Sequence, residues 1–355
     1  MGMTGRILGR LLPVLLAAVL AGCSKEREIP SPDDGAVTVR LVLNMPSPRA
    51  GGTAEPDAEP EGNDYWLHPR DVQLLVYDTE GNFEDRVVMS LLTPVTGTFN
   101  RYTLSGTLTR LRKADVEGGK SYRIVVLCNL AGACPVAFPY GDIPATEEEL
   151  YGGMTFEYPL ENTLTHAIFD GTDSGRIPMW GKKTAVLKDC STITVDMLRA
   201  MAKVKVCLDR NALIQEDPDA TYTLSSVVVK HCHMQGSMAP RYAGEQADTY
   251  EPAADEENVV GDFHGMAVPF HEHPAGSGEF YIYLPEQKKG GSEMEVTINN
   301  HVYPLKFGDY STKKLFPVVR NYYYVFNIVK INTTNGLVYQ VCKWQEMEAG
   351  EIVFD

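Results

Sequence analysis

The feature of the sequence that most constrains the fold is a series of short segments in which apolar residues fall at every second position. In the clearest of them, residues 37–45, the alternation continues without a break. A period of two places these apolar side chains on one face of a β-strand; they are Val37, Val39, Leu41, Leu43 and Met45. No long stretch has the period of an amphipathic helix. The pattern therefore predicts an all-β fold.

The other segments of this kind predict the domain organisation. In the first half, strands are expected at 72–78, 102–108 and 122–128, and a mixture of helix and loop at 144–170, with a short helix at 147–150. In the second half, strands are expected at 202–208, 222–229, 279–284, 293–298, 303–307, 322–331, 337–344 and 351–354. Gly, Pro and Asp turns between short strands are typical of β-sandwiches. A break near 184–191 predicts two sandwich domains of comparable size, 36–187 and 188–355.

Residues 1–22 have the layout of a secretory signal peptide. Arg6 and Arg10 precede the apolar run 11–20, which is shorter than the roughly 20 residues that span a bilayer. Small residues then lead to Cys23, and this pattern resembles a bacterial lipobox. We therefore expect export, removal of residues 1–22 and acylation of Cys23. The polar, proline-rich residues 23–35 would form a lipidated flexible tether.

Composition excludes two classes of partner. The formal net charge is −15, and no basic run compensates for it. Nucleic acid is therefore not an expected partner. Anionic lipid headgroups are not expected to attract the chain either, so attachment to the outer membrane would depend on the acyl chains.

The segment after the first predicted strand is expected to form an exposed, protease-accessible loop. Residues 46–64 are rich in Pro, Gly and Glu and contain Arg49 followed by Ala50. An arginine-specific protease could cut there without touching either domain, with Arg70 as a competing site closer to the next strand. Cleavage would free the strand at 37–45 and leave a groove between unpaired sheet edges, which is a template for a strand of another chain.

The chemical signals elsewhere favour structural roles. His231-Cys232-His233 continues a predicted strand, with His264 and the pair His271 and His273 further along the chain. Alternation would place His231 and His233 on one face and Cys232 on the other, which is too few ligands for a metal site. Residues 171–175 lack the further ligands of a calcium loop. No motif marks a catalytic centre, so we predict no enzyme activity, no cofactor and no metal.

Aromatic residues and cysteines leave two alternatives open. Trp66, Trp180, Trp344 and the run Tyr322-Tyr323-Tyr324 are expected to anchor cores in preference to forming a sugar-stacking platform. The exported chain has further cysteines, some in apolar contexts, and either one disulfide or none is expected. These cysteines are Cys128, Cys134, Cys190, Cys207, Cys232 and Cys342.

Taken in order along the chain, several segments resemble the fimbrillin superfamily, the lipoprotein-derived pilus subunits of Bacteroides-type bacteria. The matching features are the lipobox at 20–23, the early strand followed by Arg49-Ala50, the strand and turn at 72–81, residues 177–181, the stretch 195–206, residues 280–286, and the closing segment with Arg320, Asn321, Tyr323 and Trp344. The stretch 195–206 is the most family-like of them.

This resemblance implies two transthyretin-like β-sandwich domains in tandem and polymerisation by donor-strand exchange. By position, Arg49 would be the cleavage residue and 37–45 the removed strand. The donor would be the C-terminal segment, and its candidate residues are Leu337, Tyr339, Val341, Ile352 and Phe354. The implied partners are other fimbrial subunits, the outer membrane through lipid, and an arginine-specific protease.

The functional hypothesis is therefore a shaft or tip subunit of a cell-surface fimbria, with a role in adhesion. Two alternatives remain. One is an anchor subunit that keeps its lipid and its first strand. The other is a surface glycan-binding lipoprotein with a similar β-sandwich build.

Overall fold

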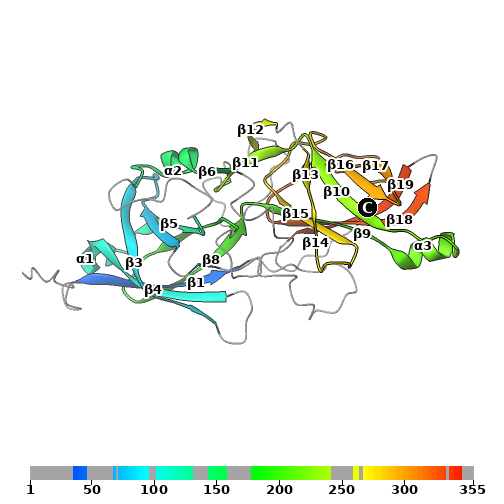
Figure 1. Ribbon diagram of the computed structural model, residues 1–355. Coiled ribbons are helices and arrows are strands. Elements are labelled where there is room, and N and C mark those ends of the chain that lie inside the picture. Colours follow the sequence, from blue (N-terminus) through cyan, green and yellow to red (C-terminus); the bar gives the residue numbers. More distant parts are fainter. Residues whose placement is uncertain are drawn as a thin grey trace, which may run out of the picture.

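The computed structural model describes residues 35–45, 67–68, 71–95, 101–130, 143–157, 177–240, 259–263, 267–332 and 336–345. These residues are mostly in β-strands, which confirms the predicted β class. Figure 1 shows two lobes, with the short helix α1 (Lys113–Val116) towards one end of the molecule and α3 (Arg210–Glu216) at the other. The predicted terminal strand at 351–354 lies outside the described residues.

The first lobe is built around a closed barrel of seven strands. They are β1 (Ala36–Asn44), β2 (Val72–Tyr77), β3 (Phe83–Pro94), β4 (Arg101–Arg112), β5 (Ser121–Cys128), β7 (Met179–Val186) and β8 (Ser191–Arg199). Their order around the barrel is β1-β4-β3-β2-β5-β7-β8. Because β1 pairs with β4 on one side and β8 on the other, the sheet closes on itself.

The strand β8 follows the predicted break at 187, yet it pairs with β1 and β7 of the first lobe. The sequence reading predicted none of β3, β7 or β8 as strands. In β8, the alternation was present in Ile193, Val195 and Met197, whose side chains are buried in the barrel core. The alternation in the sequence could therefore have identified β8 as a strand.

The second lobe consists of two larger sheets that enclose one core and a smaller third sheet. The four-stranded sheet runs β13 (Val268–Pro269), β10 (Leu224–Lys230), β16 (Glu293–Ile298) and β17 (His301–Lys306). The five-stranded sheet runs β14 (His271–Glu272), β15 (Glu279–Leu284), β9 (Ala202–Leu208), β18 (Tyr322–Asn332) and β19 (Gly336–Gln345). Val227 and Val296 from the first of these sheets share a buried cluster with Val204 and Phe326 from the second.

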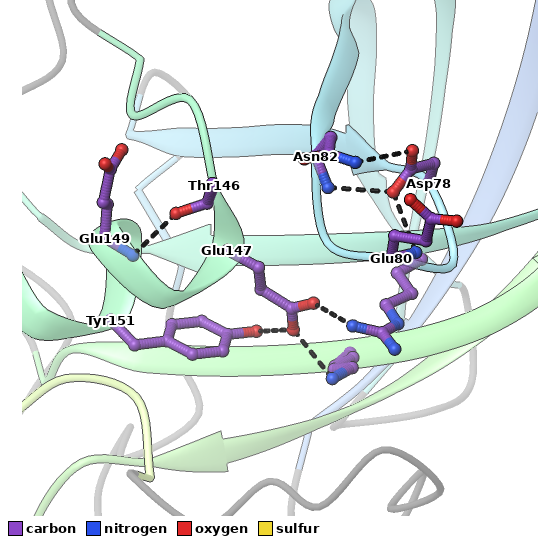
Figure 2. A network of polar contacts seen from close by, with 9 residues as sticks. Asp78, Glu80, Asn82, Thr146, Glu147, Glu149 and Tyr151 are labelled. Atoms are coloured by element: carbon purple, nitrogen blue, oxygen red, sulfur yellow. Dashed lines mark hydrogen bonds and ion pairs between the residues drawn. The ribbon is translucent and has the colours of Figure 1, made fainter.

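A second buried layer covers the outside of the barrel. Helix α2 (Glu147–Gly153) places Leu150 in a cluster with Tyr77 and Trp180. The helix begins at Thr146, whose side-chain oxygen accepts a hydrogen bond from the Glu149 backbone N–H at 3.2 Å (Figure 2). Trp180 is 3% exposed, which confirms its predicted role as a core anchor.

Ionic contacts fasten α2 to the barrel wall through Glu147. Its carboxylate accepts hydrogen bonds from Arg123 Nη1 at 3.0 Å and from the Tyr151 hydroxyl at 2.6 Å (Figure 2). Lys182 Nζ lies 2.7 Å from the same carboxylate, and both side chains of this pair are buried. Since Arg123 lies on β5 and Lys182 on β7, one carboxylate holds the helix to two neighbouring strands.

The two lobes are joined by polar contacts around Arg320, which is 1% exposed. Its Nη2 donates to Glu286 Oε2 at 2.7 Å and to the Ser237 carbonyl at 2.8 Å, and Nη1 donates to the Met238 carbonyl at 2.7 Å. Met238 in turn packs in the cluster that covers the barrel. The small sheet of β12 (Val259–Phe263), β11 (His233–Ser237) and β6 (Thr155–Glu157) also connects segments from both halves of the chain.

Candidate functional site

The strand β1 is the element with the strongest functional prediction, and it is fully integrated in the barrel. It runs antiparallel to β4, with Leu41 opposite Leu104 and Leu43 opposite Tyr102. On its other side it runs parallel to β8, with Leu41 aligned with Ile193 and Leu43 with Val195. Both of its edges are therefore hydrogen-bonded to neighbouring strands.

The alternation predicted for β1 is confirmed by its burial. The inward side chains are at most 2% exposed; they are Val37, Val39, Leu41, Leu43 and the adjoining Met45. Thr38 and Arg40, on the opposite face, are exposed. Full burial of an aliphatic side chain is worth about 1.5–3 kcal/mol, so these residues together contribute on the order of 10 kcal/mol. Removal of β1 would expose the core of the barrel along the whole strand.

The start of β1 is tied to the turn between β7 and β8. The Thr38 N–H donates to Asp189 Oδ1 at 3.0 Å, and the Cys190 N–H donates to the Thr38 carbonyl at 2.7 Å. Asp189 also lies 2.9 Å from Lys113 Nζ, and the Lys113 N–H donates to the Gly35 carbonyl at 2.8 Å. The hydrogen bond from Thr38 and the contact with Lys113 hold the pKa of Asp189 below its ordinary value. We call Thr38, Lys113, Asp189 and Cys190 the β1 latch.

At the other end of β1, a side-chain hydrogen bond links the strand to β8. Asn44 Nδ2 donates to Asp196 Oδ1 at 2.7 Å, which links β1 to β8 at the end of their pairing. The predicted cleavage residues Arg49 and Ala50, the competing site Arg70 and the lipidation residue Cys23 lie outside the described residues. The latch was missed by sequence reasoning, because its members are far apart in the chain.

The candidate donor residues occupy places in the C-terminal lobe. Leu337, Tyr339 and Val341 lie on β19, which pairs with β18 at the edge of the five-stranded sheet. Leu337 is buried, and the Tyr339 ring contacts Phe326 with a centroid distance of 5.8 Å. Donation by this segment would therefore require β19 to leave β18. Ile352 and Phe354 lie outside the described residues.

The histidine cluster differs from the prediction. Residues 231–233 do not continue one strand, because His231 has a φ of 53° and ends β10 in a turn. Cys232 and His233 are both buried and His231 is exposed, so the prediction that the two histidines share one face and Cys232 the other is wrong. Within the described residues, no group of three or more His, Cys, Asp or Glu side chains is arranged to hold a metal ion. His264 and the calcium-like segment 171–175 lie outside that part of the chain.

The described cysteines are thiols, and none of them forms a disulfide. Cys128 is buried, as its apolar context predicted, whereas Cys207, whose sequence context is similarly apolar, is only half-buried. Cys232 is also buried, and Cys190 is exposed in the β1 latch. Burial raises the pKa of Cys232 to about 11 and that of Cys128 well above its ordinary value. Cys134 and the side chain of Cys342 lie outside the part of the chain that the structure describes. Among the helices that the structure describes, none has the length and apolar character to cross a bilayer.

Comparison with known proteins places these features in a family. Residues 61–349 match the sequence profile of the Mfa2 family, described as fimbrillin-A associated anchor proteins Mfa1 and Mfa2. No curated protein sequence matches the chain.

Solved structures match the fold over most of the chain. The tip fimbrial protein Mfa3 from Porphyromonas gingivalis, with a C-terminal truncation, is 13% identical with a TM-score of 0.51, and the match covers 86% of this chain and 100% of that one. A fimbrial assembly protein from Parabacteroides distasonis is 12% identical with a TM-score of 0.47, covering 86% of this chain and 95% of that one.

Proposed function

Because the chain belongs to the family of fimbrillin-A associated anchor proteins Mfa1 and Mfa2, we propose that it is a fimbrial subunit whose first strand, β1, is the element exchanged during assembly. Membership of a fimbrial family agrees with the prediction that the chain is not an enzyme. The observation that carries the proposal is the position of β1 in the barrel. It is the first strand that the structure describes, it fills a core groove along its whole length, and the residues after it include a predicted cleavage site.

The groove left by β1 would determine which backbone and side-chain groups an incoming strand must provide. Departure of β1 would free the edges of β4 and β8 and uncover Leu104, Ile193 and Val195. An incoming strand would satisfy both edges through its backbone and the core through apolar side chains at alternate positions. It would need a backbone N–H at the position of Thr38, so proline is excluded there. A head-to-tail series of such exchanges gives a filament.

Export and processing complete this proposal. Cys23 would carry the lipid that holds the subunit at the outer membrane, and an arginine-specific protease would cut between Arg49 and Ala50. Cleavage would separate the lipidated segment and β1 from the rest of the chain in one step. The mature subunit would then pass from the membrane to the fimbria.

The partner strand would come from another fimbrial subunit. Within this chain the candidate donor residues Leu337, Tyr339 and Val341 already pair in β19 and pack against their own core. Release of β19 would sacrifice those contacts, which favours a role for this chain as the acceptor of a strand. A shaft role would require β19, or the residues that follow it, to act as the donor.

The β1 latch favours one alternative role. Contacts from Asp189, Cys190 and Lys113 hold the start of β1, and a chain that retained this strand would keep its lipid as an anchor subunit. The anchor role therefore differs from the shaft and tip roles in one property, which is whether β1 leaves.

We also propose that the two lobes are the tandem transthyretin-like domains implied by the resemblance. Strand pairing supports a boundary at 200–201, between β8 and β9, instead of 187–188. Asn321 would hold this boundary, because its N–H donates to the Met201 carbonyl at 2.9 Å and its Oδ1 accepts from the Arg199 N–H at 3.2 Å.

Limited proteolysis tests the exchange. Recombinant protein that begins at Ser24 would be treated with an arginine-specific protease, alone and with purified partner subunits, and followed by native size analysis and N-terminal sequencing. A new N-terminus at Ala50, loss of residues 37–45 and concentration-dependent multimers are expected. The variant Arg49→Gln is the matched control and should remain monomeric. A protease-resistant monomer that keeps residues 37–45 would contradict exchange and favour the anchor role.

A further inference from the structure

A cavity of about 500 Å³, lined by both polar and apolar atoms, lies in the second lobe beside α3, at the end of the molecule away from the barrel (Figure 1). Its walls come from three segments: the start of α3, the residues that lead into β10, and the loop between β14 and β15. Small-molecule sites occupy roughly 300–1,000 Å³, so the cavity is large enough for one or two sugar rings.

The backbone around the cavity is fastened by its own hydrogen bonds. In the loop between β14 and β15, Glu272 Oε1 accepts from the Gly278 N–H at 2.8 Å, and the His273 N–H donates to the Glu279 carbonyl at 2.9 Å. On the facing side, Asn299 Oδ1 accepts from the Thr223 N–H at 2.8 Å. The walls therefore hold their shape without a ligand, which lowers the entropic cost of binding.

Several polar side chains in the lining are not engaged by this framework. Across the described part of the chain, no hydrogen bond or ion pair involves the side chains of Arg210, Asn211 or Tyr222. They offer a guanidinium fork, a carboxamide and a phenol, which together donate and accept hydrogen bonds. The Tyr222 ring also packs against the lobe's core, so its position is restrained.

The charge of the lining discriminates between ligand classes. It contains the carboxylates of Asp209, Glu272 and Glu279 and a single guanidinium, that of Arg210. Glu279 is paired with Lys205 at 2.7 Å, and Asp209 accepts from the Ala212 N–H at 3.0 Å. Carboxylates still outnumber cations, so an acidic ligand would meet a repulsive field.

We propose that this cavity binds a neutral or amino sugar at the end of a glycan chain. Sugar hydroxyls both donate and accept, which matches a lining of guanidinium, carboxamide, phenol and carboxylate. The Tyr222 ring supplies the apolar surface on which a sugar ring can rest. A cationic amino group on the sugar would be favoured by the carboxylate of Glu272.

The position of the cavity suits a subunit that contacts other cells, an inference that rests on the proposed membrane attachment. The start of β1 lies beside α1, because Ala36 pairs with Arg112 immediately before that helix. A lipidated tether that precedes β1 would place this end towards the membrane and the cavity towards the outside (Figure 1). The cavity is also separate from the β1 groove, so strand exchange would leave it accessible.

Ligand-detected NMR and calorimetry with the intact chain from Ser24 onward test the proposal. The probes are N-acetyllactosamine, chitobiose, mannobiose and 3′-sialyllactose. At least one of the first three is expected to bind with a Kd on the order of 1 mM, a common strength for a few hydrogen bonds and one ring contact. Arg210→Ala should weaken binding about tenfold, which corresponds to loss of a hydrogen bond from a charged donor.

Two variants make the test specific. Arg101→Ala removes an exposed arginine from β4 of the barrel and should bind as the unmodified chain does. Tyr222→Phe keeps the ring and removes only the hydroxyl, so a smaller loss is expected. Absence of binding by the three neutral or amino sugars, equal binding by Arg210→Ala, or tighter binding of 3′-sialyllactose would overturn the proposal. These measurements use the uncleaved monomer, so failure of strand exchange would not affect them.

Discussion

Asp189 accepts a hydrogen bond from the backbone N–H of Thr38, 3.0 Å away, and so connects the turn before β8 to the start of β1. These residues are 151 positions apart in the chain. The contact lies at the one place where the barrel closes through a parallel pair of strands. The stability of β1 is therefore controlled both by its buried face and by this turn.

Truncation of the buried face of β1 should destabilise the first lobe. Leu41→Ala is expected to lower the free energy of unfolding by about 2–5 kcal/mol, because it leaves a cavity in the barrel core. Arg40→Ala, the exposed neighbour, should change it by less than about 0.5 kcal/mol. Urea denaturation followed by intrinsic tryptophan fluorescence measures both. Equal effects would mean that β1 is not packed as described.

Loss of the Asp189 charge should loosen the start of β1 with a defined pH dependence. The hydrogen bond from Thr38 and the contact with Lys113 lower the pKa of Asp189, so its contribution is present above the ordinary value of 3.8 and is lost as pH falls below it. Asp189→Asn should accelerate hydrogen exchange around residues 38–40 at pH 7 by a modest factor, corresponding to at most about 1 kcal/mol for an exposed pair. The difference between the variant and the unmodified chain should shrink as pH falls below 3.8; a difference that does not shrink would contradict this role.

Glu147→Gln should weaken the attachment of α2. Burial opposes ionisation of Glu147, but hydrogen bonds from Lys182 and Tyr151 outweigh it and lower its pKa from 4.5. Its stabilising contribution is therefore present at neutral pH and is lost on acidification below that value. The substitution leaves the buried Lys182 without its counter-charge and should cost about 3–5 kcal/mol. Glu148→Gln, at the exposed neighbouring position, is the control, and thermal unfolding from pH 7 to pH 3 is the measurement.

A chain without β1 should recover its barrel when the strand is supplied separately. A peptide with the sequence of residues 37–45 is expected to bind a subunit that begins at Ala50 and to raise its Tm. A peptide of the same composition with the alternation shifted by one residue should fail, because it presents the polar face to the core. Equal stabilisation by both peptides would show that the groove does not select for register.

Thiol labelling should follow the burial of the cysteines. Cys190 is exposed, whereas burial raises the pKa values of Cys128 and Cys232 and disfavours their thiolates. Iodoacetamide under native conditions should therefore modify Cys190 first, with Cys128 and Cys232 protected until the chain unfolds. Peptide mass spectrometry, with Cys190→Ser as the control, checks this order. Early labelling of Cys232 would contradict its buried position.

Local alternation was a reliable guide to individual strands. The five apolar residues from Val37 to Met45 predicted both the strand and the buried face, since side-chain direction in a strand depends only on position along the chain. Cys128 and Trp180 were also placed correctly in cores, whereas Cys207 is only half-buried. The prediction failed at His231, whose positive φ turns the chain between two sheets, and it also missed β8, although Ile193, Val195 and Met197 alternate there.

The sequence by itself determined the β class, the buried face of β1 and, through its ordered motifs, the fimbrial family. Only the tertiary structure decided that β1 pairs with both β4 and β8, that Asp189 fastens its start, and that Arg210 and Tyr222 line one cavity. The physical reason is that strand pairing and polar contacts join residues far apart in the chain, whereas periodicity reports only on neighbours. The position of each strand in its sheet depends on which edges remain unpaired after the others have packed.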